Sequence, residues 1–355
     1  MVSAISQLKG GKMNNHAENR GCNSTTGETA PSFLNLHPDS VITLLEDVME
    51  KEFSNLFRPL NSYINRVYEL QDRQGTAVIV KFYRPGRWSK AAIAEEHLFL
   101  QEMETFEIPV ICPLQLANGE TLGCWNGIYF AIFPKCGGRS VDEFSDDQWL
   151  ELGRLVGRAH AVGNIRAADS RDKMVPSVTT RRQLAYLEEN RLVAEELRRS
   201  FFELAGQLIE EIENLFHDVT IQRIHGDLHF SNIIYRPGES FYLIDFDDMA
   251  MGPQVQDVWM LLQGYGEDSL VELDLFLEGY ETFHSFDRKS CRLIEPLRAM
   301  RYIHYLAWCG YQVVEDGTTR VLPDFGSYTF WQNEITELGD QIERIHNNSN
   351  PFGHV

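Results

Sequence analysis

The stretch RIHGDLHFSNIIYRPGESFYLIDFDD, residues 223–248, is the most informative part of this 355-residue chain. It holds two histidines, four aspartates and one asparagine. Asp227 lies in the glycine-containing segment HGDLH, Asn232 follows five residues later, and Asp245 ends the apolar run FYLID. A strand over that run would deliver Asp245 to the end of the strand. The segment therefore predicts two loops whose polar side chains converge.

Such a convergence suits a magnesium site that acts on phosphate. Mg²⁺ keeps several waters and takes one or two carboxylates together with substrate phosphates, so Asn232 and Asp245 are the expected metal ligands. Phosphoryl transfer to a hydroxyl needs an oriented proton acceptor, and Asp227 can supply it. Each residue alone has a structural alternative as a cap or an Asx-turn. The set at this spacing predicts ATP and Mg²⁺ chemistry, with Asp227 and Asp245 as catalytic residues.

The first third of the chain supplies a possible phosphate-binding lysine. The segment TAVIVKFY (76–83) alternates with the period of a β-strand, and Lys81 lies inside it, where a lysine needs a reason. Residues 89–106 have helical periodicity, and Glu96 lies on their apolar side. A Lys81–Glu96 ion pair would hold Lys81 on the α- and β-phosphates of ATP. Glu95 is the alternative partner.

The pattern of elements divides the chain into three parts. Residues 1–34 are poor in large apolar side chains, so we expect a disordered tail. Residues 35–134 predict a small sheet with one prominent helix, an ATP-binding lobe. The segment PKCGGRS (134–140) predicts a hinge. Helices dominate the third part, residues 135–347, and Ser145 with Gln148 predicts a capping box at the first of them.

Composition excludes several classes of protein. The net charge of −20 argues against a nucleic-acid partner, because a phosphate backbone needs a basic surface. No apolar run approaches the roughly 20 residues that span a bilayer, and the N-terminus lacks the apolar core of a secretory signal. We therefore expect a cytoplasmic protein without a membrane partner, in which a local cationic patch and metal ions hold ATP.

Two motifs carry a resemblance to a known family. HGDLHFSN followed by LIDFDD resembles the catalytic and metal loops of the aminoglycoside phosphotransferase/choline kinase superfamily. The segments PLNSYINRVYEL, VKFYRPGRW, GPQVQDVWMLL and IEPLRAMR are similar to those of the RdoA group of bacterial serine/threonine protein kinases. The likeness covers about residues 36–340. It implies an α+β, bilobal protein-kinase-like fold, with a small β-sheet lobe and a larger, mainly helical C-terminal lobe.

The resemblance also implies roles for single residues. Asp227 would be the catalytic base, Asn232 and Asp245 the Mg²⁺ ligands, and Lys81 with Glu96 the pair that positions ATP. Ser62 would lie in the loop over the ATP phosphates, with Asn65 and Arg66 nearby. His225 and Asp257 would support the backbone of the catalytic loop. Asp247 is an auxiliary metal carboxylate or a structural residue.

The sequence departs from common patterns at three points. The loop NSYINR lacks the GxGxxG of ordinary protein kinases, Ser231 replaces a frequent glycine before Asn232, and the metal triplet is DFD instead of DFG. The second departure costs backbone freedom but removes no ligand. The third argues against an activation-loop switch of the protein-kinase type.

Three functions remain open from the sequence. The first is an ATP- and Mg²⁺-dependent kinase of protein Ser/Thr hydroxyls, which the resemblance places in a bacterial stress response. The second is a phosphotransferase of a small molecule such as an amino alcohol, sugar or aminoglycoside, and the acidic surroundings of the site would suit a cationic acceptor. The third is a nucleotide-binding pseudokinase. Four arginines either line a substrate cleft or form a solvated face: Arg154, Arg158, Arg181 and Arg182.

Overall fold

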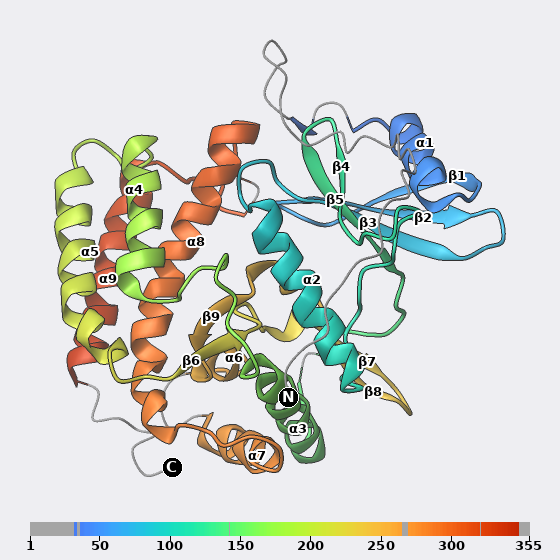
Figure 1. Cartoon of the computed structure of the whole chain (residues 1–355). Coiled ribbons are helices and arrows are strands. Elements are labelled where there is room, and N and C mark those ends of the chain that lie inside the picture. The colour runs from blue at the N-terminus through green and yellow to red at the C-terminus, as the bar shows by residue number, and fades with distance from the viewer. Residues whose placement is uncertain (1–31, 34–35, 142, 265–268, 320, 348–355) are drawn as a thin grey trace, which may run out of the picture.

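The computed structural model describes residues 32–33, 36–141, 143–264, 269–319 and 321–347. These residues form a bilobal protein-kinase-like fold, with a small sheet lobe and a larger, mainly helical lobe (Figure 1). The predicted disordered tail, residues 1–34, falls almost entirely outside the described residues. The elements of the small lobe are α1 (Pro38–Met49), β1 (Phe53–Leu60), β2 (Arg66–Asp72), β3 (Ala77–Phe82), α2 (Lys90–Thr105), β4 (Gly123–Trp125) and β5 (Ile128–Pro134).

The small lobe is built on one antiparallel sheet of five strands in the order β1-β2-β3-β5-β4. The alternation in β3 divides its side chains as the sequence predicts. Val78, Val80 and Phe82 enter the apolar cluster of this lobe, whereas Ile79 and Lys81 face a cavity between the lobes. Helix α1, which we did not predict, packs on β1 and adds a second helix to this lobe.

Helix α2 connects the two lobes. It begins after Ser89, whose hydroxyl accepts a hydrogen bond from the backbone N–H of Ala92 at 3.1 Å, a helix cap. Phe99 and Met103 of α2 are buried in the large apolar cluster of the helical lobe. In the sequence, the helix lies among the elements of the small lobe, but its buried side chains pack largely against the helical lobe.

The large lobe begins with helix α3 (Asp146–Gly163). The predicted capping box is present: Ser145 Oγ accepts from Gln148 N, and Gln148 Oε1 accepts from Ser145 N. The other helices are α4 (Arg181–Glu189), α5 (Arg198–Glu213), α6 (Val255–Trp259), α7 (Leu270–Tyr280), α8 (Ile294–Asp316) and α9 (Tyr328–Asn347). Two antiparallel strand pairs complete it: β6 (Ile221–Ile224) with β9 (Ala250–Pro253), and β7 (Ile233–Arg236) with β8 (Ser240–Leu243).

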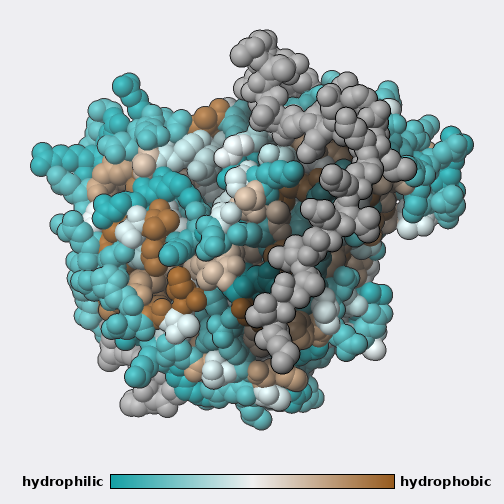
Figure 2. Space-filling view, in the orientation of Figure 1, coloured by the Kyte–Doolittle hydropathy of each residue, from teal (hydrophilic) through white to brown (hydrophobic). Residues whose placement is uncertain are grey.

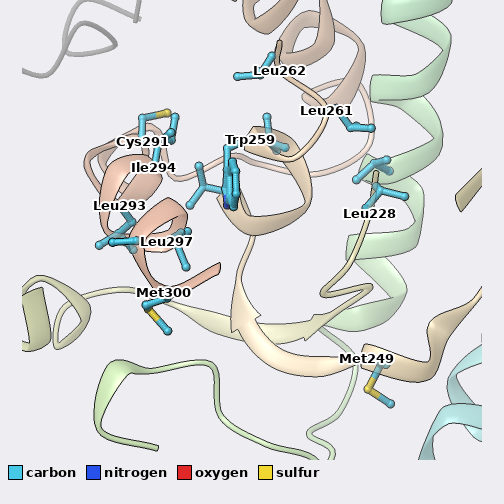
Figure 3. Packing of buried hydrophobic residues seen from close by; sticks show 14 of the residues in the cluster. Leu228, Met249, Trp259, Leu261, Leu262, Cys291, Leu293, Ile294, Leu297 and Met300 are labelled. Atoms are coloured by element: carbon cyan, nitrogen blue, oxygen red, sulfur yellow. The ribbon is translucent and has the colours of Figure 1, made fainter. Parts of the chain in front are cut away.

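The loops next to these strand pairs contribute to the core of the large lobe. Leu228 and Met249 are buried in the same apolar cluster as Leu297 of α8 (Figure 3). The face seen in Figure 2 is mainly hydrophilic, with apolar residues in separate patches. None of the helices in the described part of the chain has the length and apolar character needed to cross a membrane.

Candidate active site

A cavity of about 660 Å³ lies between the two lobes. It brings together all six residues that the sequence predicted for the site, although they come from four separate segments of the chain. These residues are Ser62, Lys81, Glu96, Asp227, Asn232 and Asp245.

The buried carboxylate of Asp257 holds the backbone of the loop that carries Asp227. Asp257 of α6 accepts hydrogen bonds from the backbone N–H groups of His225 at 2.7 Å and Gly226 at 2.8 Å. The same carboxylate contacts His160 Nε2 at 3.0 Å. The supporting role expected for Asp257 thus has a direct geometric basis, and His160 of α3 takes part in the same network.

The loops of Asp227 and Asp245 are fastened to each other. His225 Nε2 donates to the carbonyl of Ile244 at 2.8 Å. Gly226 has φ +84°, and a Cβ there would lie 2.2 Å from the carbonyl oxygen of Asp248. Only glycine allows this approach. The catalytic and metal loops therefore pack backbone against backbone.

Asp227 lies between two basic side chains. Arg301 Nη2 of α8 is 2.8 Å from Asp227 Oδ1, and His229 Nε2 is 3.5 Å from Oδ2. Although burial by itself would raise it, the hydrogen bond from His229 and the charge of Arg301 hold the pKa of Asp227 below its usual value. The carboxylate is therefore ionised at neutral pH and able to accept a proton in the reaction.

Asn232 and Asp245 offer oxygen atoms suited to a hard cation. Asn232 Nδ2 donates to the carbonyl of Asp227 at 2.9 Å, which leaves its Oδ1 for another partner. Asp245 has a left-handed backbone, φ 61°, and its side chain is 55% exposed in the cavity. A left-handed non-glycine residue is costly and is often retained for function. One carboxylate and one amide oxygen, with phosphate and water, fit Mg²⁺.

Lys81 is surrounded by three carboxylates. Its Nζ lies 3.0 Å from Asp245 Oδ1, 3.2 Å from Asp247 Oδ1 and 3.9 Å from Glu96 Oε1. Burial alone would lower the pKa of Lys81, but these charges raise it well above its usual value. Lys81 is thus a fixed cation in the cavity wall.

Glu96 contacts Lys81 at the edge of ion-pair range and has a nearer partner. Arg171 Nη2 lies 2.8 Å from Glu96 Oε2, and both side chains are buried. The alternative residue, Glu95, accepts from the backbone N–H of Ser170 and does not line the cavity. The structure therefore places Glu96 toward Lys81 and Glu95 away from it.

The loop NSYINR covers the cavity from the small lobe. Ser62 lines it, and Asn65 is buried. Asn65 Nδ2 donates to Asp247 Oδ2 at 3.2 Å, while its Oδ1 accepts from the backbone N–H of Arg84. Arg66 instead pairs with Asp316 at the end of α8, at 3.7 Å.

Sequence reasoning missed the arginines of this site. Arg87 pairs with Asp247 and, at 2.5 Å, with Asp248, so one guanidinium binds both aspartates. Arg301 and Arg171 were also missed. The segment RPGR (84–87), soon after Lys81, was the only available signal, because the partners of Arg87 lie 160 and 161 residues away.

Comparison with known proteins identifies the family. The sequence model of the phosphotransferase enzyme family (APH) matches residues 57–294. The chain belongs to this family, as the two loop motifs and the fold indicated. It is 36% identical to stress response kinase A of Escherichia coli K12 over 316 residues, which cover 89% of this chain and 95% of that protein. It is 35% identical to the serine/threonine protein kinase RdoA of Salmonella typhimurium over 320 residues, 90% of this chain and 96% of that protein.

Solved structures show the same fold at low sequence identity. Amicoumacin kinase hAmiN, in complex with AMP-PNP, Ca²⁺ and Ami, has a TM-score of 0.69 at 19% identity. That match covers 85% of this chain and 93% of the other. A microcompartment-associated aminopropanol kinase has a TM-score of 0.65 at 18% identity, and the match covers 89% of this chain and 100% of that kinase. These likenesses support the kinase-like fold.

Proposed function

We propose that this chain transfers the γ-phosphoryl group of ATP to Ser or Thr hydroxyls of proteins, with Mg²⁺ as cofactor, in a bacterial stress response in the cytoplasm. The observation that carries the proposal is the meeting of Asp227, Asn232, Asp245 and Lys81 in one cavity between two lobes. This is the set that phosphoryl transfer needs: a proton acceptor, metal ligands and a cation for the phosphates.

Each residue has a defined task in this proposal. Lys81 would bind the α- and β-phosphates, and Ser62 would approach them from the loop above. Asn232 and Asp245 would hold Mg²⁺, which when bound supplies positive charge to the phosphate oxygens. Asp227 would orient the acceptor hydroxyl and take its proton. The buried network below Asp227 keeps this carboxylate in place during the transfer.

The protein acceptor is supported by the relative named serine/threonine protein kinase RdoA, to which the chain is similar over 90% of its length. A small-molecule acceptor is the second candidate. One observation favours it: a further cavity of about 560 Å³ beside the site has the size of small-ligand pockets, roughly 300–1,000 Å³.

The decisive experiment offers labelled ATP and Mg²⁺ to the protein with generic protein acceptors and, separately, with a panel of hydroxylated metabolites. We expect label on Ser or Thr of proteins, only with a divalent metal. Asp227→Asn should reduce turnover by roughly 10²- to 10⁴-fold while keeping most nucleotide affinity. Label confined to one metabolite would overturn the protein-kinase proposal, and normal rates in Asp227→Asn would remove Asp227 as the base.

A further inference from the structure

A second cavity, of about 560 Å³, lies beside the nucleotide cavity and contains none of the six site residues predicted from the sequence. Most of its walls come from three parts of the chain: the loop at residues 84–88, the segment around residues 172–183, and helix α8. Ile64, Gly226, Asp248, Ala250 and Gln256 complete the lining. Apolar side chains form part of the lining, namely Trp88, Met174, Leu297, Met300, Trp308 and Tyr311. The cavity therefore combines an apolar surface with a charged one, as ligand sites commonly do.

The second cavity adjoins the first at the catalytic base. Six residues line both: Ile64, Arg87, Asp248, Arg301, His304 and Trp308. Gly226, which directly precedes Asp227, also lines the second cavity, and Arg301 pairs with Asp227 at 2.8 Å. A hydroxyl held in the second cavity near Arg301 and Gly226 would thus lie close to Asp227.

Arginines outnumber carboxylates in this lining. Four arginines face it, against three acidic residues, in a chain whose net charge is −20. His304 adds no charge at neutral pH, because burial and the nearby Arg301 lower its pKa to about 4. The arginines are Arg84, Arg87, Arg182 and Arg301, and the acidic residues are Asp172, Asp248 and Glu315.

Each of the three carboxylates already has an arginine partner. Arg182 binds Asp172 with both terminal nitrogens, at 2.8 and 2.5 Å. Arg87 binds Asp248, and Arg84 binds Glu315. The partner of the fourth arginine, Arg301, is Asp227, which lines the other cavity.

The aspartates that the sequence suggested as a site for a cationic acceptor are also paired with basic side chains. Asp227 pairs with Arg301, Asp245 with Lys81, and Asp247 and Asp248 with Arg87. The cationic group of an acceptor would have to compete with Lys81 or with an arginine for these carboxylates. An anion would instead meet guanidinium groups that already contact a carboxylate. A guanidinium has five N–H donors in a fixed plane, so those not bound to its partner can still bind a carboxylate or phosphate.

We propose that the second cavity is the acceptor site and that it takes a hydroxyl compound with an anionic group, a carboxylate or a phosphate, close to the hydroxyl. The inference rests on the proposed kinase function and specifies its acceptor. An acidic residue next to a Ser or Thr of a protein has this chemistry, and so does a small hydroxylated acid. Arg182, with its side chain 54% exposed, and Arg301, at 31%, are the arginines best placed to meet the anion.

The reaction at this site balances without a further reactant. The acceptor oxygen forms a bond to the γ-phosphorus, and the bond between that phosphorus and the β,γ-bridging oxygen breaks. The bridging oxygen keeps the electron pair and leaves as part of ADP. The proton of the hydroxyl passes to Asp227, and the anionic group of the acceptor stays unchanged on the guanidinium groups.

The test measures binding of charge-matched acceptor pairs to the protein saturated with a non-hydrolysable ATP analogue and Mg²⁺. One pair is a serine peptide flanked by aspartates and the same peptide flanked by lysines. The other pair is a small hydroxy acid and an amino alcohol. We expect at least one anionic member to bind about tenfold tighter than its cationic counterpart, and the pair that shows this identifies the source.

Two variants at the start of α4 locate the effect. Arg182→Gln removes a cavity guanidinium, and Arg181→Gln removes the same charge from the neighbouring exposed residue, which does not line the cavity. We expect Arg182→Gln to weaken binding of the anionic acceptor by about fivefold or more, with nucleotide affinity unchanged. Arg181→Gln should have no such effect.

The outcomes separate this inference from the proposed function. Preference for the cationic members, no preference by charge, or equal losses in both variants would overturn the acceptor assignment. Absence of any phosphoryl transfer sensitive to Asp227→Asn would overturn the kinase proposal, whereas the binding preference would still decide the chemistry of the cavity.

Discussion

Lys81 Nζ lies 3.2 Å from Asp247 Oδ1 and 3.9 Å from Glu96 Oε1, so the buried carboxylate nearest to this lysine comes from the metal loop and not from helix α2. Asp247 is itself held by Arg87 and by Asn65. Glu96 is held by Arg171, which also donates to the carbonyl of Asp247 at 2.7 Å. The two carboxylates thus have different arginine counter-ions, Arg87 for Asp247 and Arg171 for Glu96.

These different counter-ions predict different consequences for two matched substitutions. Asp247→Asn should weaken nucleotide binding by roughly tenfold, because Lys81 loses a fixed partner. Glu96→Gln should change nucleotide binding less but lower the free energy of unfolding by about 3 kcal/mol, because it leaves Arg171 buried without its counter-ion. Nucleotide titration and urea unfolding of both variants measure these effects. If Glu96→Gln weakened nucleotide binding more than Asp247→Asn does, Glu96 would be the residue that positions Lys81.

The pair of Arg301 and Asp227 predicts a change in pH dependence. The cation keeps the pKa of Asp227 low, so the ionised base persists above that pKa and activity is lost only as the pH falls through it. Arg301→Met should raise this pKa and move the acid limb of kcat/KM upward by about one pH unit or more. Arg301→Lys retains the charge and should keep the limb near its original position. An unchanged limb in Arg301→Met would contradict the coupling.

The buried carboxylate of Asp257 predicts a large stability effect away from the cavity. Asp257→Ala leaves two backbone N–H groups and His160 without their acceptor, which should cost about 3 kcal/mol or more of unfolding free energy. Asp274→Ala, at an exposed position on α7, is the control, and it should stay within about 0.5 kcal/mol of wild type. Equal effects in urea unfolding would show that Asp257 does not support the loop.

The left-handed backbone of Asp245 makes Asn its best replacement, because Asn tolerates that conformation. Asp245→Asn should therefore fold normally, yet the Mg²⁺ concentration for half-maximal turnover should rise by at least tenfold, since a neutral amide replaces an anionic ligand. Titration of Mg²⁺ at saturating ATP measures this. A wild-type magnesium dependence would exclude Asp245 as a ligand.

The local patterns in the sequence predicted local structure well. The alternation around Lys81 located β3 and the face of its lysine, and Ser145 with Gln148 located the start of α3. Helix α1 carried a usable signal as well, with Pro38 at its start and apolar residues at helical spacing, and we overlooked it. Strand β1 was harder, because its Pro59 and exposed positions obscure any alternation.

The ion pairs of the site could not be predicted in the same way. Arg87 meets its aspartates across 160 residues of sequence, and Arg301 meets Asp227 from a helix of the opposite wall. No periodicity links such residues, since their meeting depends on how the two lobes pack. The spacing of residues in the sequence therefore predicted which residues form the site. The ion pairs that determine the charge of the site could be seen only in the folded structure.

The close approach of Gly226 to Asp248 has a consequence for how the enzyme opens. Asp227 and Asp245 both stand on loops anchored in the core of the helical lobe, and the packed backbones leave no room for one loop to slide past the other. Rotation of the sheet lobe would move Lys81 and Ser62 away but would not alter the distance between Asp227 and Asp245. Nucleotide exchange would then displace only Lys81 and Ser62, which the proposal places at the phosphates. Each new ATP would bind to a site in which Asp227 and Asp245 already have their final arrangement.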